Sequence, residues 1–329
     1  MNKLIFAGDR PLDFIAMGRA GVDLYARERN TPLEAVSGFD KFVGGSPANI
    51  AAGLAKLGAR VGFIGKVSED PLGRYVVDYL RGIGIDVTQI AFDASGSKTG
   101  LAFTEMKAED CALVMYRNNA ADLLIRPQDV SEDYIRQAKA LVLSGTALCR
   151  SPSRDAVFLA LAYARKHGTV VIFDVDYRPY SWGSPEEVSI YYSLAAEKCD
   201  VIIGTREELD AMEYAIDPGN TDDAASARRW FGHNARIVVI KHGKNGSFAY
   251  TREGQTYRGG IFPVELVKPF GAGDAFASAF SHGLLQGHDV SACLEAGAAS
   301  ASIVISRDSC VEAMPTIGEI EDFIAAHSR

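Results

Sequence analysis

The stretch Phe270-Gly271-Ala272-Gly273-Asp274 opens a helical run over 275–280 and follows a segment that we expect to be a strand, ending near Lys268. Two glycines at a helix entrance let backbone N–H groups approach a bound anion, and the helix dipole adds partial positive charge there. Asp274 can cap the helix or accept a proton from an alcohol. The stretch therefore indicates either phosphoryl transfer to a hydroxyl group or an ordinary glycine turn with an aspartate N-cap.

A second glycine-rich stretch, Gly44-Gly45-Ser46-Pro47-Ala48-Asn49, precedes a helix that we expect over 47–57. In this order and at this separation, the two stretches resemble the two signature segments of the ribokinase-like (PfkB) carbohydrate kinases. The resemblance extends from about Phe14 to the C-terminus. It implies ATP and Mg²⁺ as cofactors, Asp274 as the base beside an anion hole of Gly271, Ala272 and Gly273, and sugar contacts from Asp23, Gly44, Gly45 and Asn49.

Bulk composition excludes several classes of partner. A net charge of −8 and a pI near 5.4 argue against a nucleic-acid-binding surface. The five cysteines are an odd number without a Cys-x-x-Cys pair, which is typical of a reduced, cytoplasmic protein. No run approaches the roughly 18 apolar residues of a membrane span, so we expect a soluble protein with no membrane partner.

Apolar runs of strand and helix length alternate along most of the chain, a pattern typical of an α/β protein with a doubly wound, mainly parallel sheet. No linker interrupts them, so we expect one domain over 1–329. We expect strands over 14–17, 61–65, 140–143, 169–175, 200–203 and 236–241, a hairpin of 247–251 with 255–259, and helices over 47–57, 72–82, 155–167, 206–212, 224–231, 275–286, 291–306 and 317–327.

The alternation is broken by two strand-like segments, 100–106 and 112–116, with no helix between them. Together with 22–42 they predict a small separate sheet. The family resemblance implies that such a sheet, here about 20–43 and 98–118, forms a lid over the sugar, and that the lid can serve as a homodimer interface.

Two further segments are candidates for the nucleotide site. Lys241, Gly243 and Gly246 follow a buried strand, at the edge where open α/β sheets bind ligands. The resemblance implies that Thr205 and Glu208 lie beside the nucleotide, with Glu208 holding Mg²⁺ through water, although Thr205 replaces the asparagine of the family. Lys268-Pro269-Phe270 also departs from the Asp-Thr or Thr-Thr of many relatives, so the family's dependence on a monovalent cation is not carried over to this chain, and the question stays open.

Five segments, 18–25, 115–122, 144–148, 174–182 and 267–274, resemble the family members that phosphorylate keto-deoxy sugar acids. The resemblance implies transfer of the ATP γ-phosphoryl group to the terminal hydroxyl of such an acid. Arg117 and Arg178 are candidates for the acid's carboxylate, because a guanidinium can bind two carboxylate oxygens at once. The alternatives are a kinase for a second keto-deoxy acid, a fructokinase-like kinase, or a non-catalytic sugar-binding regulator.

Overall fold

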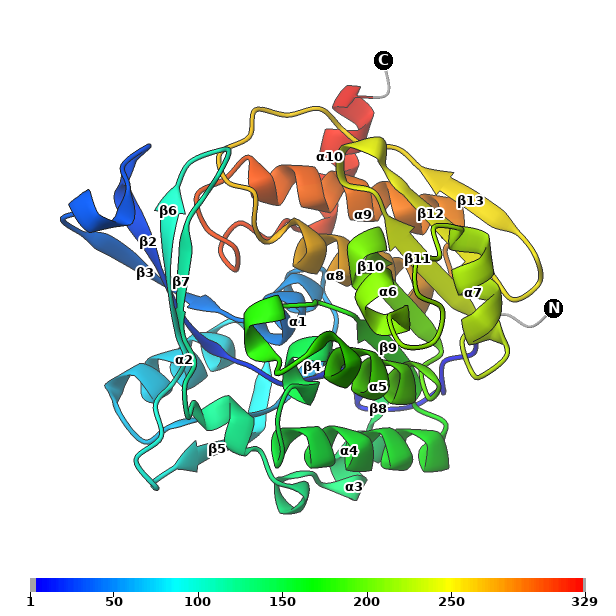
Figure 1. Ribbon diagram of the computed structural model, residues 1–329, viewed down its shortest axis with the longest axis horizontal. Coiled ribbons are helices and arrows are strands. Elements are labelled where there is room, and N and C mark those ends of the chain that lie inside the picture. Colours follow the sequence, from blue (N-terminus) through cyan, green and yellow to red (C-terminus); the bar gives the residue numbers. More distant parts are fainter. Residues whose placement is uncertain (1–3, 328–329) are drawn as a thin grey trace.

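The structure, a computed structural model, describes residues 4–327 (Figure 1). Within that range, nine strands form one sheet in the order β13-β12-β11-β10-β9-β8-β1-β4-β5. The strands from β11 to β5 in this order pair in parallel, and the hairpin β12–β13 adds an antiparallel edge. The prediction of a doubly wound, mainly parallel sheet is confirmed. The strands are β1 (Leu12–Met17), β4 (Val61–Ser68), β5 (Asp86–Asp93), β8 (Ala138–Ser144), β9 (Val170–Asp174), β10 (Val201–Thr205), β11 (Ile237–Lys241), β12 (Ser247–Thr251) and β13 (Thr256–Gly259).

Helices cover both faces of this sheet because its central strands are apolar on both faces. In β1, Phe14 and Ala16 belong to one buried cluster, whereas Ile15 and Met17 belong to the other. The first cluster is completed by α1 (Ser46–Lys56), α2 (Pro71–Gly82), α8 (Ala272–Leu285) and α9 (Val290–Ile305), with α10 (Ile317–His327) packed on α9. The second is completed by α3 (Glu132–Arg136), α4 (Ser153–His167), α5 (Pro185–Ala196), α6 (Arg206–Glu213) and α7 (Asp223–Phe231).

A smaller sheet projects from one side of this core (Figure 1). It contains β2 (Gly21–Arg29), β3 (Phe39–Gly44), β6 (Leu101–Met106) and β7 (Leu113–Tyr116), in the order β3-β2-β6-β7. The register pairs Asp23 with Ala102, and Ala102 with Met115. Alternate residues of a strand point to opposite faces, so these three side chains share the face that looks toward the core site.

Two sets of secondary-structure predictions differ from the structure. The expected strand ending near Lys268 is wrong: residues 260–270 have no strand, because this segment, which contains Pro263 and Pro269, runs past the end of α9 and donates the N–H groups of Val267 and Lys268 to Ile305. The sequence reading also omitted β5, α3 and α5. Helix α5 supplies the crossover that parallel β9 and β10 require.

Candidate active site

The carboxyl ends of the parallel strands and the start of α8 meet at one cavity, whose other wall is the small sheet. Gly271 is the N-cap of α8 and has a φ of 87°, a left-handed conformation that favours glycine. A Cβ at this position would lie 2.6 Å from the Sγ atom of Cys310. The N-cap glycine offers no side chain to the first turn of α8, so the backbone N–H groups there lack an N-cap side-chain partner, and Gly271 itself lines the cavity. The α8 entrance is therefore suited to an anion.

Asp274 lies in the first turn of α8 and is buried, with 9% of its surface exposed. Its carboxylate does not cap the helix, so the N-cap interpretation of the sequence is wrong. Instead, Oδ2 accepts a hydrogen bond of 2.7 Å from Nδ2 of Asn49. Burial and the nearby charge of Asp176 raise the pKa of Asp274 to about 6, while the bond from Asn49 opposes that rise. A carboxylate with such a pKa is well suited to accept a proton near neutral pH.

In the glycine-rich stretch 44–49, the two glycines leave space for neighbouring groups. A Cβ at Gly44 would lie 2.0 Å from the carboxyl carbon of Asp23, so Gly44 admits that side chain and is itself outside the cavity lining. Gly45 lines the cavity with a φ of 105°. Asn49 also lines it, and its Oδ1 atom is buried without a hydrogen-bond partner in the described chain. Burial raises the pKa of Asp23.

Both predicted arginines line the cavity, and each is paired with an aspartate. Arg117 is buried, and its Nε atom lies 3.0 Å from Asp122 while Nη2 donates to the carbonyl of Thr146. Arg178 lies 2.6 Å from Asp176, whose charge raises the pKa of the guanidinium. Arg178 is therefore already paired with a carboxylate of the chain itself.

Arg19 is a third arginine in the cavity, and it was not among the site residues predicted from the sequence. Only 9% of its surface is exposed, yet Nε and Nη2 are buried without a hydrogen-bond partner among the described residues. Its closest opposite charge is Asp23, at 3.5 Å. A buried guanidinium with unsatisfied donors costs free energy unless a ligand provides acceptors. The signal in the sequence was Gly18-Arg19-Ala20-Gly21, a charged residue between small ones at the end of a buried strand.

The proposed nucleotide residues lie at the ends of β10 and β11. Lys241 ends β11, and a Cβ on Gly273 would lie 3.4 Å from its Nζ atom, so the ammonium faces the start of α8. Asp174, at the end of β9, lies 4.0 Å from the same Nζ atom, and burial raises its pKa well above the usual value. Gly243 and Gly246 have φ values of 54° and 87°. Asp174 and Asp176 were not predicted as site residues, although Asp174 ends a buried strand and Asp176 follows it.

Glu208 and Thr205 form the capping box of α6. Oε2 of Glu208 accepts from the N–H of Thr205 at 2.7 Å, and Oε1 accepts from the N–H of Tyr177 at 3.2 Å. Within residues 4–327, no three histidine, cysteine or acidic side chains converge as a metal site. Mg²⁺ does not require such a cluster of three side chains, because it usually keeps several waters and binds through one or two carboxylates and the substrate phosphates. Glu208 retains lone pairs that fit a water-mediated contact.

The chain as a whole is similar to known proteins. The family model described as "pfkB family carbohydrate kinase" matches residues 13–317. The chain belongs to the pfkB family of carbohydrate kinases. It is 58% identical over 328 residues to 5-dehydro-2-deoxygluconokinase of Geobacillus kaustophilus, covering 99% of this chain and 98% of that one. It is 59% identical over 325 residues to the enzyme of the same name from Bacillus thuringiensis, covering 98% of each chain.

Among solved structures, the fructokinase of Xylella fastidiosa with bound ATP has a TM-score of 0.83 to this pfkB chain, at 24% identity, over 96% of this chain and 99% of that chain. This likeness shows the same fold. The described part of the chain contains no helix long and apolar enough to cross a membrane, and all five cysteines are free thiols.

Proposed function

We propose that this pfkB protein transfers the γ-phosphoryl group of ATP to the terminal hydroxyl of 5-dehydro-2-deoxy-D-gluconate, giving the 6-phosphate and ADP. The observation that carries the proposal is the identity of 58–59%, over nearly the whole of both chains, to proteins named 5-dehydro-2-deoxygluconokinase. The cavity supports it chemically, because it joins a buried carboxylate, an uncapped helix start and three arginines.

In the proposed reaction, the substrate's terminal oxygen attacks the γ-phosphorus while the bond to the ADP oxygen breaks. Asp274 orients the hydroxyl and takes its proton late, since an alcohol is too weak an acid for prior deprotonation. The N–H groups of Gly271, Ala272 and Gly273, together with Lys241, bind the phosphates as negative charge shifts onto the ADP oxygen. Mg²⁺, held by the phosphates and through water by Glu208, would add further charge neutralisation.

The remaining residues have proposed roles in binding. Asp23 and the free Oδ1 of Asn49 accept hydrogen bonds from sugar hydroxyls, and Gly45 allows the backbone to approach the sugar. Thr205, Gly243 and Gly246 lie beside the nucleotide, where glycines without Cβ atoms leave room for the base and ribose. The small sheet, 20–43 and 98–118, acts as a lid that excludes water, which would otherwise compete for the phosphoryl group.

An acidic substrate is supported most directly by Arg19. Arg117 and Arg178 lie 2.5 and 2.6 Å from Asp122 and Asp176, whereas Arg19 lies 3.5 Å from Asp23 and has buried donors without a hydrogen-bond acceptor. A substrate carboxylate would supply those acceptors. We therefore place Arg19 first among the carboxylate-binding residues, with Arg117 and Arg178 lining the same end of the cavity.

The outer face of the small sheet supports a proposed homodimer. Residues on the face opposite Ala102 and Met115 include Val114 and Tyr116, which are 44% and 62% exposed at the edge strand β7. Exposed apolar strand edges are frequent sites of association. The free thiols are in keeping with the proposed location in the reducing cytoplasm.

The deciding experiment measures ADP release with Mg²⁺-ATP on 5-dehydro-2-deoxygluconate, 2-keto-3-deoxygluconate and fructose side by side. We expect the highest kcat/KM on the first acid, and carbon NMR of the product should place the phosphate on the terminal oxygen. A higher kcat/KM on the second acid or on fructose would reassign the substrate within the family. Absence of ADP release on every sugar would favour a non-catalytic sugar-binding protein.

A further inference from the structure

Lys268 is fully buried, with 0% of its surface exposed, three residues before Gly271. Its Nζ atom donates to the carbonyl oxygen of Phe270 at 2.9 Å and to that of Val304 at 3.0 Å. Burial lowers the pKa of this ammonium, while Cys310 and Asp274 act in the opposite direction. A lysine is rarely fully buried unless its charge has a dedicated partner, so this position calls for a functional explanation.

The two carbonyls come from segments that the active site must hold in register. Phe270 immediately precedes the N-cap of α8, and Val304 lies in the last turn of α9. Carbonyls at a helix C-terminus carry partial negative charge. Without a cation between them, the carbonyl oxygens of Phe270 and Val304 would repel each other. The ammonium therefore fastens the entrance of α8 to the end of α9, which is packed beside it (Figure 1).

The same contact fixes the left-handed turn at Gly271. A Cβ on Gly271 would lie within 2.6 Å of Cys310 and 3.2 Å of Val304, so the turn lies directly on the residues that surround the ammonium. Phe270 is held on its other side by the ring of Tyr25, at a centroid distance of 5.1 Å. The orientation of the first-turn N–H groups of α8 thus depends on a loop whose polar anchor is Lys268.

We infer that Lys268 is a positioning residue whose ammonium serves as a built-in monovalent cation for the anion hole. Backbone carbonyl oxygens can bind a potassium ion by replacing its hydration shell. The carbonyl oxygens around the ammonium of Lys268 bind it in the same way. Here the chain supplies the cation covalently. Turnover should therefore be independent of added potassium, and removal of the side chain should leave a carbonyl-lined space that a small monovalent cation can enter.

The test compares wild type with Lys268→Ala and Lys268→Met in buffer whose only cation besides Mg²⁺ is tetramethylammonium, which is too large for the space. We expect wild-type kcat to change by less than about 2-fold when ammonium or potassium replaces tetramethylammonium at constant ionic strength. Lys268→Ala should lose about 10-fold or more in kcat and recover most of it with ammonium or potassium. Lys268→Met, whose side chain fills the space, should lose kcat and recover little.

Lys66→Met is the matched control. Lys66 is also buried, and its Nζ atom contacts the carbonyl of Leu124 at 3.0 Å and Asp129 at 2.7 Å, but it does not line the cavity. This variant should lower the unfolding midpoint without a cation-dependent kcat. If Lys268 only caps α9, then Lys268→Ala should behave like the control, with a lower midpoint and no cation rescue, and the inference would be overturned.

Two further outcomes bear on the inference separately. Several-fold activation of wild type by potassium would contradict it, even if both Lys268 variants failed to fold. The kinetic readout rests on the proposed phosphoryl transfer, so ATP affinity is also measured by calorimetry. If no sugar is turned over, the proposed function fails, while cation-restored ATP binding in Lys268→Ala would still support the role of Lys268, and unrestored binding would reject it.

Discussion

Asp274 combines its proposed catalytic role with a cost in stability. Its folded pKa of about 6 is above the unfolded value of 3.8, so folding favours the protonated form. The protonated carboxyl group therefore contributes to the free energy of unfolding. That contribution is fully present below pH 3.8 and is lost as the pH rises through about 6. We predict that Asp274→Asn lowers kcat by about 100-fold or more. At pH 8 it should also stabilise the fold by about 1–3 kcal/mol, measured by urea unfolding. Near-normal turnover would remove Asp274 from its proposed role.

The same pKa predicts a pH profile. Because Asp274 must be ionised to accept a proton, kcat/KM should rise with pH, reach half its plateau near pH 6 and be flat above it. The residual activity of Asp274→Asn provides the control, since its profile should lack this step. A wild-type profile that is flat between pH 5 and pH 8 would show that the titrating group is not in the rate-determining step.

Arg19 and Arg178 should respond differently to the substrate's charge. Arg19→Met removes unpartnered donors, so we expect kcat/KM for the acid to fall by about 10- to 100-fold, the scale of a charge-assisted hydrogen bond. Slow turnover of fructose should fall less than turnover of the acid, because the loss on fructose comes only from leaving Asp23 without its partner at 3.5 Å. Arg178→Met leaves Asp176 unpaired near Asp274, so both substrates should suffer. Equal losses on acid and fructose in Arg19→Met would make Arg19 structural.

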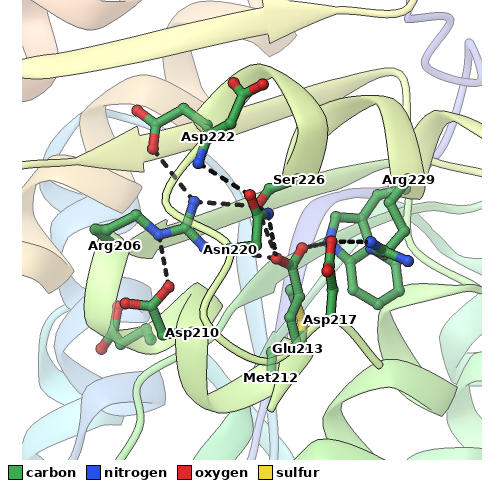
Figure 2. Close-up of polar contacts among 12 residues, drawn as sticks. Arg206, Asp210, Met212, Glu213, Asp217, Asn220, Asp222, Ser226 and Arg229 are labelled. Atoms are coloured by element: carbon green, nitrogen blue, oxygen red, sulfur yellow. Dashed lines mark hydrogen bonds and ion pairs between the residues drawn. The ribbon is translucent and has the colours of Figure 1, made fainter. Parts of the chain in front are cut away.

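At the scale of elements, a buried polar network holds the start of α6 beside the proposed nucleotide site (Figure 2). Glu213, 1% exposed, accepts from Ser226 at 2.7 Å and from Trp230 at 2.9 Å. Arg206, the first residue of α6, donates to Ser226 at 3.0 Å and lies 3.5 Å from Glu213. The network therefore connects α6 and α7, and through Arg206 it supports the neighbouring Thr205.

We predict that Glu213→Ala destabilises the protein by about 2–5 kcal/mol, because it leaves the hydroxyl of Ser226 and the indole N–H of Trp230 buried without their carboxylate acceptor. It should also raise the KM for ATP through the displaced start of α6. Asp210→Ala is the control: Asp210 pairs with Arg206 at 2.9 Å, but its side chain is 50% exposed, so the loss should be about 1 kcal/mol or less. Urea unfolding curves of the two variants would contradict the prediction if they overlapped.

Elements with strong patterns were predictable, and their contacts were not. The apolar runs of β1, β4 and β8 identify strands because both faces of each strand are buried. In contrast, β5 carries polar residues at a sheet edge, and α5 has apolar residues all around it, including exposed Ile190 and Leu194, so neither shows a clear period. The segment before Gly271 was wrongly predicted as a strand. Its backbone bonds to the end of α9, a contact that the local sequence does not reveal.

In the candidate site too, residues with a local pattern were predictable and their long-range contacts were not. Asp274, Asn49 and the glycines were found because their spacing is local to two helix entrances. The pairing of Arg117 with Asp122, the burial of Lys268 and the free donors of Arg19 arise from segments far apart in the chain, which a single sequence does not bring together. Their residue types were visible, and their partners were not.

At the scale of the whole molecule, the proposed dimer can be tested through β7. Tyr116 packs against Phe103 at a ring distance of 5.7 Å while most of its surface remains exposed. We predict that Tyr116→Asp converts a wild-type dimer to a monomer in sedimentation velocity, because a charge at an apolar interface is costly to bury. Arg136→Asp, which changes an exposed side chain on α3 outside the small sheet, should remain dimeric. A monomeric wild type would reject the dimer.

The chain passes between the two sheets four times, at residues 18–20, 45, 94–100 and 117–120. The small sheet is thus woven into the core rather than attached by one hinge, and two of its connections carry Arg19 and Arg117. For protein engineering, this means that specificity cannot be exchanged within the family by grafting a single hairpin. A functional chimera would have to transplant both hairpins and all four junctions together, since three of the junctions contribute Arg19, Gly45 and Arg117 to the cavity.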